Sequence, residues 1–198
     1  MTSKGALLGG SVHDAAQRAA DILAVLLPRA GNQLSLGSAG DSAAVSEVLR
    51  EHGEPEPVEV SPVGLEGLRR AALELREVFT AGDVTAAADT INSLLAGRAH
   101  PPRLTTHGGA SGWHLHVDSS DDAPWGEWFL TSSCLALAVL LAERQSLPAG
   151  ICASPSCGRP FVNVGRGAAR RYCSATRSRV AAHRGRSRSA PVKGPVKG

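Results

Sequence analysis

The stretch that decides the fold is APWGEWFLTSSCLALAVLLAERQ, residues 123–145. Its apolar residues recur at three- and four-residue steps, which is the spacing of an α-helical face. From Cys134 to Ala142 the stretch is apolar nearly all round, and a helix of that kind is buried on every side. We therefore predict a long helix from about Ala123 to Gln145 at the centre of the fold.

Four shorter segments before this stretch also carry apolar residues at helical spacing. The third of them follows Ser61 and starts at Pro62, a favoured first residue of a helix, and the fourth is capped by Asp83. Together they predict a helical body. The predicted helices cover residues 11–27, 42–52, 62–79 and 84–97.

Between these segments and the central helix, apolar residues no longer recur at helical spacing. Two short segments, Leu104 to Thr106 and Trp113 to Val117, have extended character and flank the Gly108-Gly109 turn. They predict a β-hairpin near residues 103–118. The fold class is therefore mainly α with a small β-hairpin (α+β), and the helical body is predicted to span residues 1–147.

Composition narrows the class of protein. The sequence contains no run of about 18 consecutive apolar residues, the length that a membrane-spanning helix needs. The apolar run from Ala6 to Leu8 is too short for the core of a secretory signal. We therefore expect a cytoplasmic protein without a membrane partner, in a reducing compartment where disulfides are rare.

Charge is divided sharply along the chain. All 18 acidic residues lie at or before Glu143, together with nine Lys or Arg, which gives this part a formal charge of −9. From Arg144 onward there are twelve Lys or Arg and no acidic residue, a charge of +12. An acidic body followed by a basic segment is typical of binding to a polyanion or to an acidic partner. The final residues, 189–198, repeat Pro-Val-Lys-Gly, cannot bury a core and are expected to be disordered.

Three cysteines in the basic segment have the spacing of a metal knuckle. Cys152 and Cys157 flank Pro155, and Cys173 follows after fifteen residues, so three thiolates could surround one Zn²⁺ in a small zinc-ribbon-like module at residues 150–188. A closed zinc site needs four ligands, and His183, a water or a partner residue are the candidates for the fourth. The alternative is that these cysteines belong to a loosely folded arm. Cys134, inside the central helix, is expected to be a buried apolar residue.

These motifs resemble the CGNR zinc-finger proteins, which carry an N-terminal ABATE domain and are described as stress-induced transcription regulators. The resemblance is carried by CASPSCGRPFV (152–162), RRYCS (170–174) and RVAAHR (179–184), and more weakly by WHLH (113–116). It covers about residues 65–184. The family continues after its third cysteine with three residues and then Cys-Gly-Asn-Arg, whereas here Ser174-Ala175-Thr176 leads directly to Arg177. The resemblance implies zinc and regulation, and a three-residue deletion has removed the fourth cysteine ligand.

Arginines are crowded into the same segment, and their guanidinium groups can pair bidentately with phosphate oxygens. DNA is the expected partner, with RNA as an alternative. A solvated basic tail that only improves solubility would have a similar composition. The candidate phosphate-binding residues are Arg166, Arg170, Arg171, Arg177, Arg179, Arg184, Arg186 and Arg188.

A second candidate site lies in the predicted hairpin. His114 and His116 would face the same side of a strand, as a two-histidine metal site requires, and His107 lies nearby in sequence. A polar sheet face is the commoner reason for such a pair. The three tryptophans Trp113, Trp125 and Trp128 could wall a small-molecule pocket with these histidines, although core packing is the simpler expectation.

The sequence thus predicts a transcription regulator that binds DNA through its basic cysteine-containing module, with a body that senses a small molecule. An RNA- or ribosome-associated binding protein without a sensing role is the first alternative. A metal-dependent enzyme using His114 and His116 is the second. No phosphate-binding loop, dinucleotide fingerprint or nucleophile elbow is present in the sequence, so no enzyme activity is expected.

Overall fold

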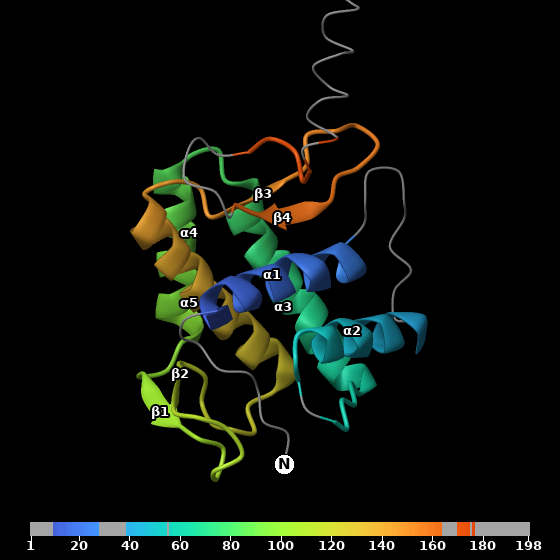
Figure 1. The fold of residues 1–198 in the computed structure, drawn as a ribbon, viewed down its shortest axis with the longest axis vertical. Coiled ribbons are helices and arrows are strands. Elements are labelled where there is room, and N and C mark those ends of the chain that lie inside the picture. The colour runs from blue at the N-terminus through green and yellow to red at the C-terminus, as the bar shows by residue number, and fades with distance from the viewer. Residues whose placement is uncertain (1–9, 28–38, 55, 164–169, 175, 177–198) are drawn as a thin grey trace, which may run out of the picture.

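The structure is a computed structural model that describes residues 10–27, 39–54, 56–163, 170–174 and 176. Within these residues it contains five helices and two antiparallel hairpins, which confirms the mainly helical α+β class (Figure 1). The helices are α1 (Gly10–Leu26), α2 (Ala39–Glu51), α3 (Pro62–Thr80), α4 (Val84–Arg98) and α5 (Trp125–Arg144). The hairpins pair β1 (Arg103–Thr105) with β2 (His114–His116), and β3 (Ala149–Ile151) with β4 (Pro160–Val162).

Side-chain caps fix the starts of α3 and α4 where the sequence predicts them. The Ser61 hydroxyl accepts a hydrogen bond from the backbone N–H of Gly64 at 3.1 Å, with Pro62 in the first helical turn. The Asp83 carboxylate accepts one from the N–H of Ala86 at 2.9 Å. Each cap satisfies a donor that the first helical turn would otherwise leave unpaired.

The central position predicted for α5 is confirmed. This helix packs against α1, α3 and α4, and α1 lies across it and α3 in Figure 1. By length and apolar composition alone α5 could cross a membrane, but its buried residues form the middle of the main core. Burial on several sides explains why it is apolar nearly all round. The largest fully buried side chains include Trp128, Phe129 and Leu137 from α5, Leu68 and Leu75 from α3, and Ile22 and Leu23 from α1.

The second hairpin, which the sequence analysis did not anticipate, joins the cysteine segment to the body. Ala149 of β3 pairs with Val162 of β4, and both side chains belong to the main hydrophobic core. Strand β4 packs against α1, and β3 packs against α3. The predicted limits of the body and the module, residues 147 and 150, therefore lie at the edge of a hairpin whose side chains fill the core of the body.

Candidate metal centre

The first two cysteines lie on a tight loop that is closed by backbone hydrogen bonds. The N–H of Cys152 donates to the carbonyl of Arg159, and the N–H of Cys157 donates to the carbonyl of Ser154, each at 2.9 Å. Gly158 has a φ of +57°, a left-handed conformation that glycine adopts without steric cost. The loop brings the Cys152 and Cys157 side chains to the same place.

The third cysteine is brought to this loop by a further backbone contact. The N–H of Ala153 donates to the carbonyl of Arg171 at 2.9 Å, which holds the chain just before Cys173 against the knuckle. The three sulfur atoms lie within 4.8 Å of one another, and those of Cys157 and Cys173 are 3.8 Å apart. Zinc–sulfur bonds of about 2.3 Å in a tetrahedron put two sulfur atoms about 3.8 Å apart. The cluster is therefore compatible with zinc binding.

The electrostatics of the cluster also suit a cation. Burial opposes ionisation of Cys152, but backbone N–H groups of Cys173 and Ser154 hydrogen-bond its sulfur and lower the pKa of its thiol. Burial and the neighbouring Cys152 and Cys157 raise the pKa of Cys173 to about 11. Three adjacent thiolates repel one another, so full ionisation of the cluster calls for a bound metal ion.

Cys134 is separate from this cluster. It is buried within α5 in the main core. Burial, with a smaller effect of Glu74, raises the pKa of its thiol to about 12. A thiol with so high a pKa is a poor metal ligand and a poor nucleophile, so Cys134 acts as a small core residue.

Asn163 attaches the module to the end of α5, a role that the sequence analysis did not identify. Its side-chain amide donates to the carbonyl of Leu147 at 2.9 Å, and its N–H donates to the carbonyl of Pro148 at 2.8 Å. Its own carbonyl accepts from Arg144 at 2.9 Å, and its side-chain oxygen accepts from the N–H of Arg170 at 3.2 Å. A buried asparagine with four satisfied contacts fixes the local geometry. An isolated asparagine carries no sequence signal of this kind.

The two arginines before Cys173 differ in their surroundings. Arg170 donates to the carbonyl of Val162 at 2.5 Å and lies over the Phe161 ring, 5.3 Å from its centroid, so part of its role is to brace β4. Arg171 is exposed. The remaining predicted residues of the module fall outside the described part of the chain: His183, Arg166, Arg177, Arg179, Arg184, Arg186 and Arg188.

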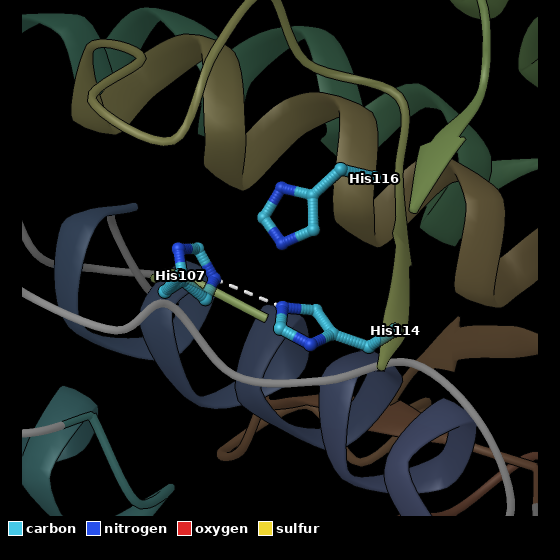
Figure 2. A group of neighbouring side chains, drawn as sticks. All are labelled: His107, His114 and His116. Carbon is cyan, nitrogen blue, oxygen red and sulfur yellow. Dashed lines mark hydrogen bonds between the residues drawn. The ribbon is translucent and has the colours of Figure 1, made fainter. Parts of the chain in front are cut away.

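The β1–β2 hairpin gathers the histidines predicted from the sequence. His114 and His116 are buried on the same face of β2, as their alternation predicts, and His107 reaches the same place from the loop (Figure 2). Their ring centroids are 4.7 to 5.1 Å apart.

The expectation that the three tryptophans pack in the core is correct for two of them and wrong for Trp113. Trp128 is buried in the main core, and Trp125 packs edge-on against it at 5.3 Å between centroids. Trp113 is 73% exposed, so it neither walls a pocket with the histidines nor joins the core. Because it directly precedes His114, the alternation of side chains along an extended segment turns it away from the histidine face.

A family model matches the C-terminal segment of the chain. Residues 149–187 match the family model of the CGNR zinc finger. This range contains β3, β4 and the three clustered cysteines, so the predicted resemblance of the module is confirmed and the segment is supported as a zinc-binding module. A comparison with curated proteins gives no match. The ABATE-like character of the body stays a prediction.

Proposed function

We propose that this protein is a DNA-binding transcription regulator whose segment 149–187 binds zinc and uses its arginines to contact DNA phosphates. The observation that carries the proposal is the three-cysteine cluster, with a sulfur separation of 3.8 Å that suits a tetrahedral zinc site. This cluster lies in a segment that carries eight arginines and no acidic residue. A metal-organised basic module next to an acidic body is suited to binding a polyanion. A cytoplasmic, nucleoid-associated location follows from that partner.

In this proposal zinc stabilises the knuckle and takes no part in a reaction. Cys152, Cys157 and Cys173 supply three ligands, and His183 or water completes the tetrahedron. Because the fourth cysteine of the CGNR pattern is missing, we expect weaker zinc binding than in a four-cysteine site. Inserting Cys-Gly-Asn between Thr176 and Arg177 should tighten zinc binding, measured by competition with a chelator. An insertion that leaves the affinity unchanged, in a chain that remains folded, would show that another group already closes the site.

The DNA contact is tested best at Arg171. Each phosphate contact contributes about one unit to the slope of log affinity against log salt, so Arg171→Gln should lower that slope by about one unit. Arg70→Gln is the matched control, because Arg70 is 69% exposed on the acidic body and pairs only weakly with Glu66 at 3.9 Å. Equal slopes for wild type, Arg171→Gln and Arg70→Gln, or no DNA binding at all, would contradict the proposal.

The same measurements distinguish the proposal from its alternative. A regulator of DNA should prefer duplex DNA over duplex RNA of equal length, whereas an RNA- or ribosome-associated protein should recognise the A-form duplex or single strands. Stronger binding to RNA in direct competition would favour the alternative. We propose that the body contributes effector sensing and that the protein acts by binding and not by catalysis.

A further inference from the structure

We propose that His107, His114 and His116 form a second metal site, in the helical body, that binds a divalent transition metal such as Zn²⁺ independently of the cysteine cluster. The three side chains are buried, and their ligand nitrogens lie within 4.8 Å of one another. Figure 2 shows the three rings converging from β2 and from the preceding loop. The proposal concerns a site different from the one that carries the proposed function.

The backbone of the loop places His107 in this arrangement. His107 has a φ of +50°, and Gly108 and Gly109, which follow it, have φ values of +68° and +89°. The backbone N–H of His107 donates to the Thr105 hydroxyl at 3.0 Å, which fixes the turn. Positive φ is uncommon in residues other than glycine, and such conformations concentrate at ligand-binding sites. The loop thus turns sharply and brings the third imidazole over the two on β2.

An oxygen atom that can accept a hydrogen bond lies beside the Nδ1 atom of each imidazole, and at His116 the Arg103 guanidinium also lies 3.4 Å from Nδ1. For His114 this acceptor is the carbonyl of Gly112 at 2.7 Å, and for His116 it is the carboxylate of Asp118 at 2.9 Å. His107 Nδ1 lies 3.5 Å from the carboxylate of Asp121. An acceptor at Nδ1 selects the tautomer with its proton there and makes Nε2 the metal-binding atom, as is usual for histidine ligands.

The two carboxylates are themselves held in place. Arg103, on β1, donates to Asp118 at 2.6 Å and also pairs with Asp121. The Thr105 hydroxyl donates to Asp121 at 2.9 Å. Two carboxylates against one guanidinium place an excess of one negative charge beside the histidines, which favours a cation.

Two of the rings are in direct contact through the nitrogens that would bind the metal. Nε2 of His107 and Nε2 of His114 lie 2.9 Å apart (Figure 2). If both Nδ1 atoms carry protons for their acceptors, both Nε2 atoms present lone pairs to each other. Such a contact is stable only when a proton or a metal ion lies between the lone pairs. A proton makes this contact an Nε2–H···N hydrogen bond, whereas zinc–nitrogen bonds of about 2.0–2.1 Å in a tetrahedron put the two atoms about 3.3–3.4 Å apart. Metal binding therefore requires the two rings to separate by about 0.4–0.5 Å, and the metal ion then also gives the third imidazole a role.

The donor set selects the class of metal. Three imidazoles suit zinc, cobalt, nickel or copper, whereas Mg²⁺ and Ca²⁺ prefer oxygen ligands. Three protein ligands also leave a fourth position for water, unlike a closed structural zinc site. This ligand set differs from the three thiolates of the cysteine cluster, and that difference makes the two sites distinguishable by spectroscopy.

The experiment is a titration of the metal-free full-length chain with Co²⁺. Thiolate ligands give cobalt a charge-transfer band in the near ultraviolet, and imidazole ligands do not. We expect two equivalents to bind, one with this band and one without it. His114→Gln should lose only the equivalent without the band. His100→Gln should keep both, because the half-exposed His100 is not one of the three clustered histidines and its Nε2 lies 3.7 Å from the carboxylate of Glu127.

A third variant tests the role of the carboxylate. Asp118→Asn keeps all three imidazoles but weakens the acceptor at His116, and loss of such a partner typically lowers metal affinity about 10- to 100-fold. If His114→Gln does not fold, this variant and the shifts of the imidazole nitrogen resonances in wild type on adding Zn²⁺ replace it. Binding of a single equivalent that always carries the thiolate band would overturn the proposal, as would two equivalents in His114→Gln. If the wild-type chain binds only the Co²⁺ equivalent without the thiolate band, the proposed function is contradicted and the histidine site stands.

Discussion

A buried ion pair joins α1 to the segment after α2. Arg18 and Glu54 lie 3.3 Å apart, and their side chains are 5% and 0% exposed. The Arg18 guanidinium also lies over the Trp128 ring at 4.3 Å and donates to the Ser132 hydroxyl at 3.4 Å. Burial lowers the pKa of Arg18, and the charges of Glu54 and Asp14 oppose that effect. The guanidinium stays charged, so its burial in the core depends on the Glu54 carboxylate to compensate that charge.

Glu54→Ala should consequently be strongly destabilising. Removal of one member of a buried pair leaves an uncompensated charge, and the free energy of unfolding should fall by about 3–5 kcal/mol. Glu66→Ala is the control, because Glu66 is 59% exposed and 3.9 Å from Arg70, and it should cost less than about 1 kcal/mol. Urea unfolding followed by circular dichroism measures both values. Similar small losses in the two variants would show that Arg18 is solvated or paired by other groups.

The Asp21 carboxyl should make the free energy of unfolding depend on pH. Burial opposes its ionisation, but hydrogen bonds from His52 and Gln17 and the charges of His52 and Arg159 lower the pKa of its carboxyl. A lowered pKa in the folded state means that its contribution is complete above the unfolded value of about 3.9 and is lost as pH falls through the folded pKa. The stability difference between wild type and Asp21→Asn should therefore shrink below about pH 4. A difference that stays constant from pH 7 to pH 3 would contradict this.

At the level of single residues, the sequence predicts those side-chain clusters whose members are set by their spacing along the chain. The cysteine cluster followed from the intervals between Cys152, Cys157 and Cys173, and the common face of His114 and His116 followed from strand alternation. The position of His107 depends on a left-handed backbone conformation, and the contacts of Asn163 depend on the end of α5. The sequence grouped His107 with the other two histidines beside the Gly108-Gly109 turn, but its backbone conformation and the contacts of Asn163 could not be predicted.

At the level of elements, the contact between α3 and α5 depends on two glycines. A Cβ atom on Gly126 would lie 2.6 Å from the backbone carbonyl carbon and oxygen of Gly67. A Cβ atom on Gly67 would lie no closer than 3.6 Å to the backbone of Gly126, which is an ordinary contact. The two helices therefore approach closely at Gly126, and the two positions should respond differently to the same substitution.

Gly126→Ala should lower the free energy of unfolding by about 1–3 kcal/mol, because the backbone of α3 would have to move. Gly67→Ala should be neutral or stabilising by up to about 1 kcal/mol, since alanine is the better helix former. Thermal unfolding of both variants under identical conditions provides the measurement. Equal melting temperatures for the two variants would show that the helices adjust without cost.

The helices were predictable because their signals are long. Apolar periodicity over many residues specified α3 and α5, and Ser61 and Asp83 marked where α3 and α4 begin. All four described strands contain three residues each, but the Gly108-Gly109 turn marked the first hairpin, and no comparable turn signal was recognised between β3 (Ala149–Ile151) and β4 (Pro160–Val162). Their pairing depends on the closed cysteine loop and on packing against α1 and α3.

At the level of the whole molecule, the hairpin that carries the knuckle also completes the core of the body. Val162 is 1% exposed and Ala149 is 3% exposed, and both belong to the same cluster as the side chains of α1, α3 and α5. Arg159 adds a contact to Asp21 of α1 at 3.3 Å. The cysteine module is thus anchored through its strands, whereas its cysteines form a small cluster of their own with Phe161.

This arrangement predicts how truncation affects the fold. A chain that ends at residue 147 loses β3, β4 and Asn163. A chain that ends at residue 163 keeps them and lacks Cys173 together with every basic residue after Arg159. Burial of one aliphatic side chain contributes about 1.5–3 kcal/mol, so the shorter chain should be less stable by at least the contribution of Val162. Its thermal transition should occur at a lower temperature than that of the chain ending at residue 163, which in turn should melt close to the metal-free full-length protein.

If both truncated chains melt cooperatively at the same temperature, the helical body is independent of the hairpin, and zinc binding orders the module without stabilising the body. If the shorter chain is the less stable, the metal site is built on a hairpin that the core needs, and zinc bound at the knuckle should raise the melting temperature of the whole protein.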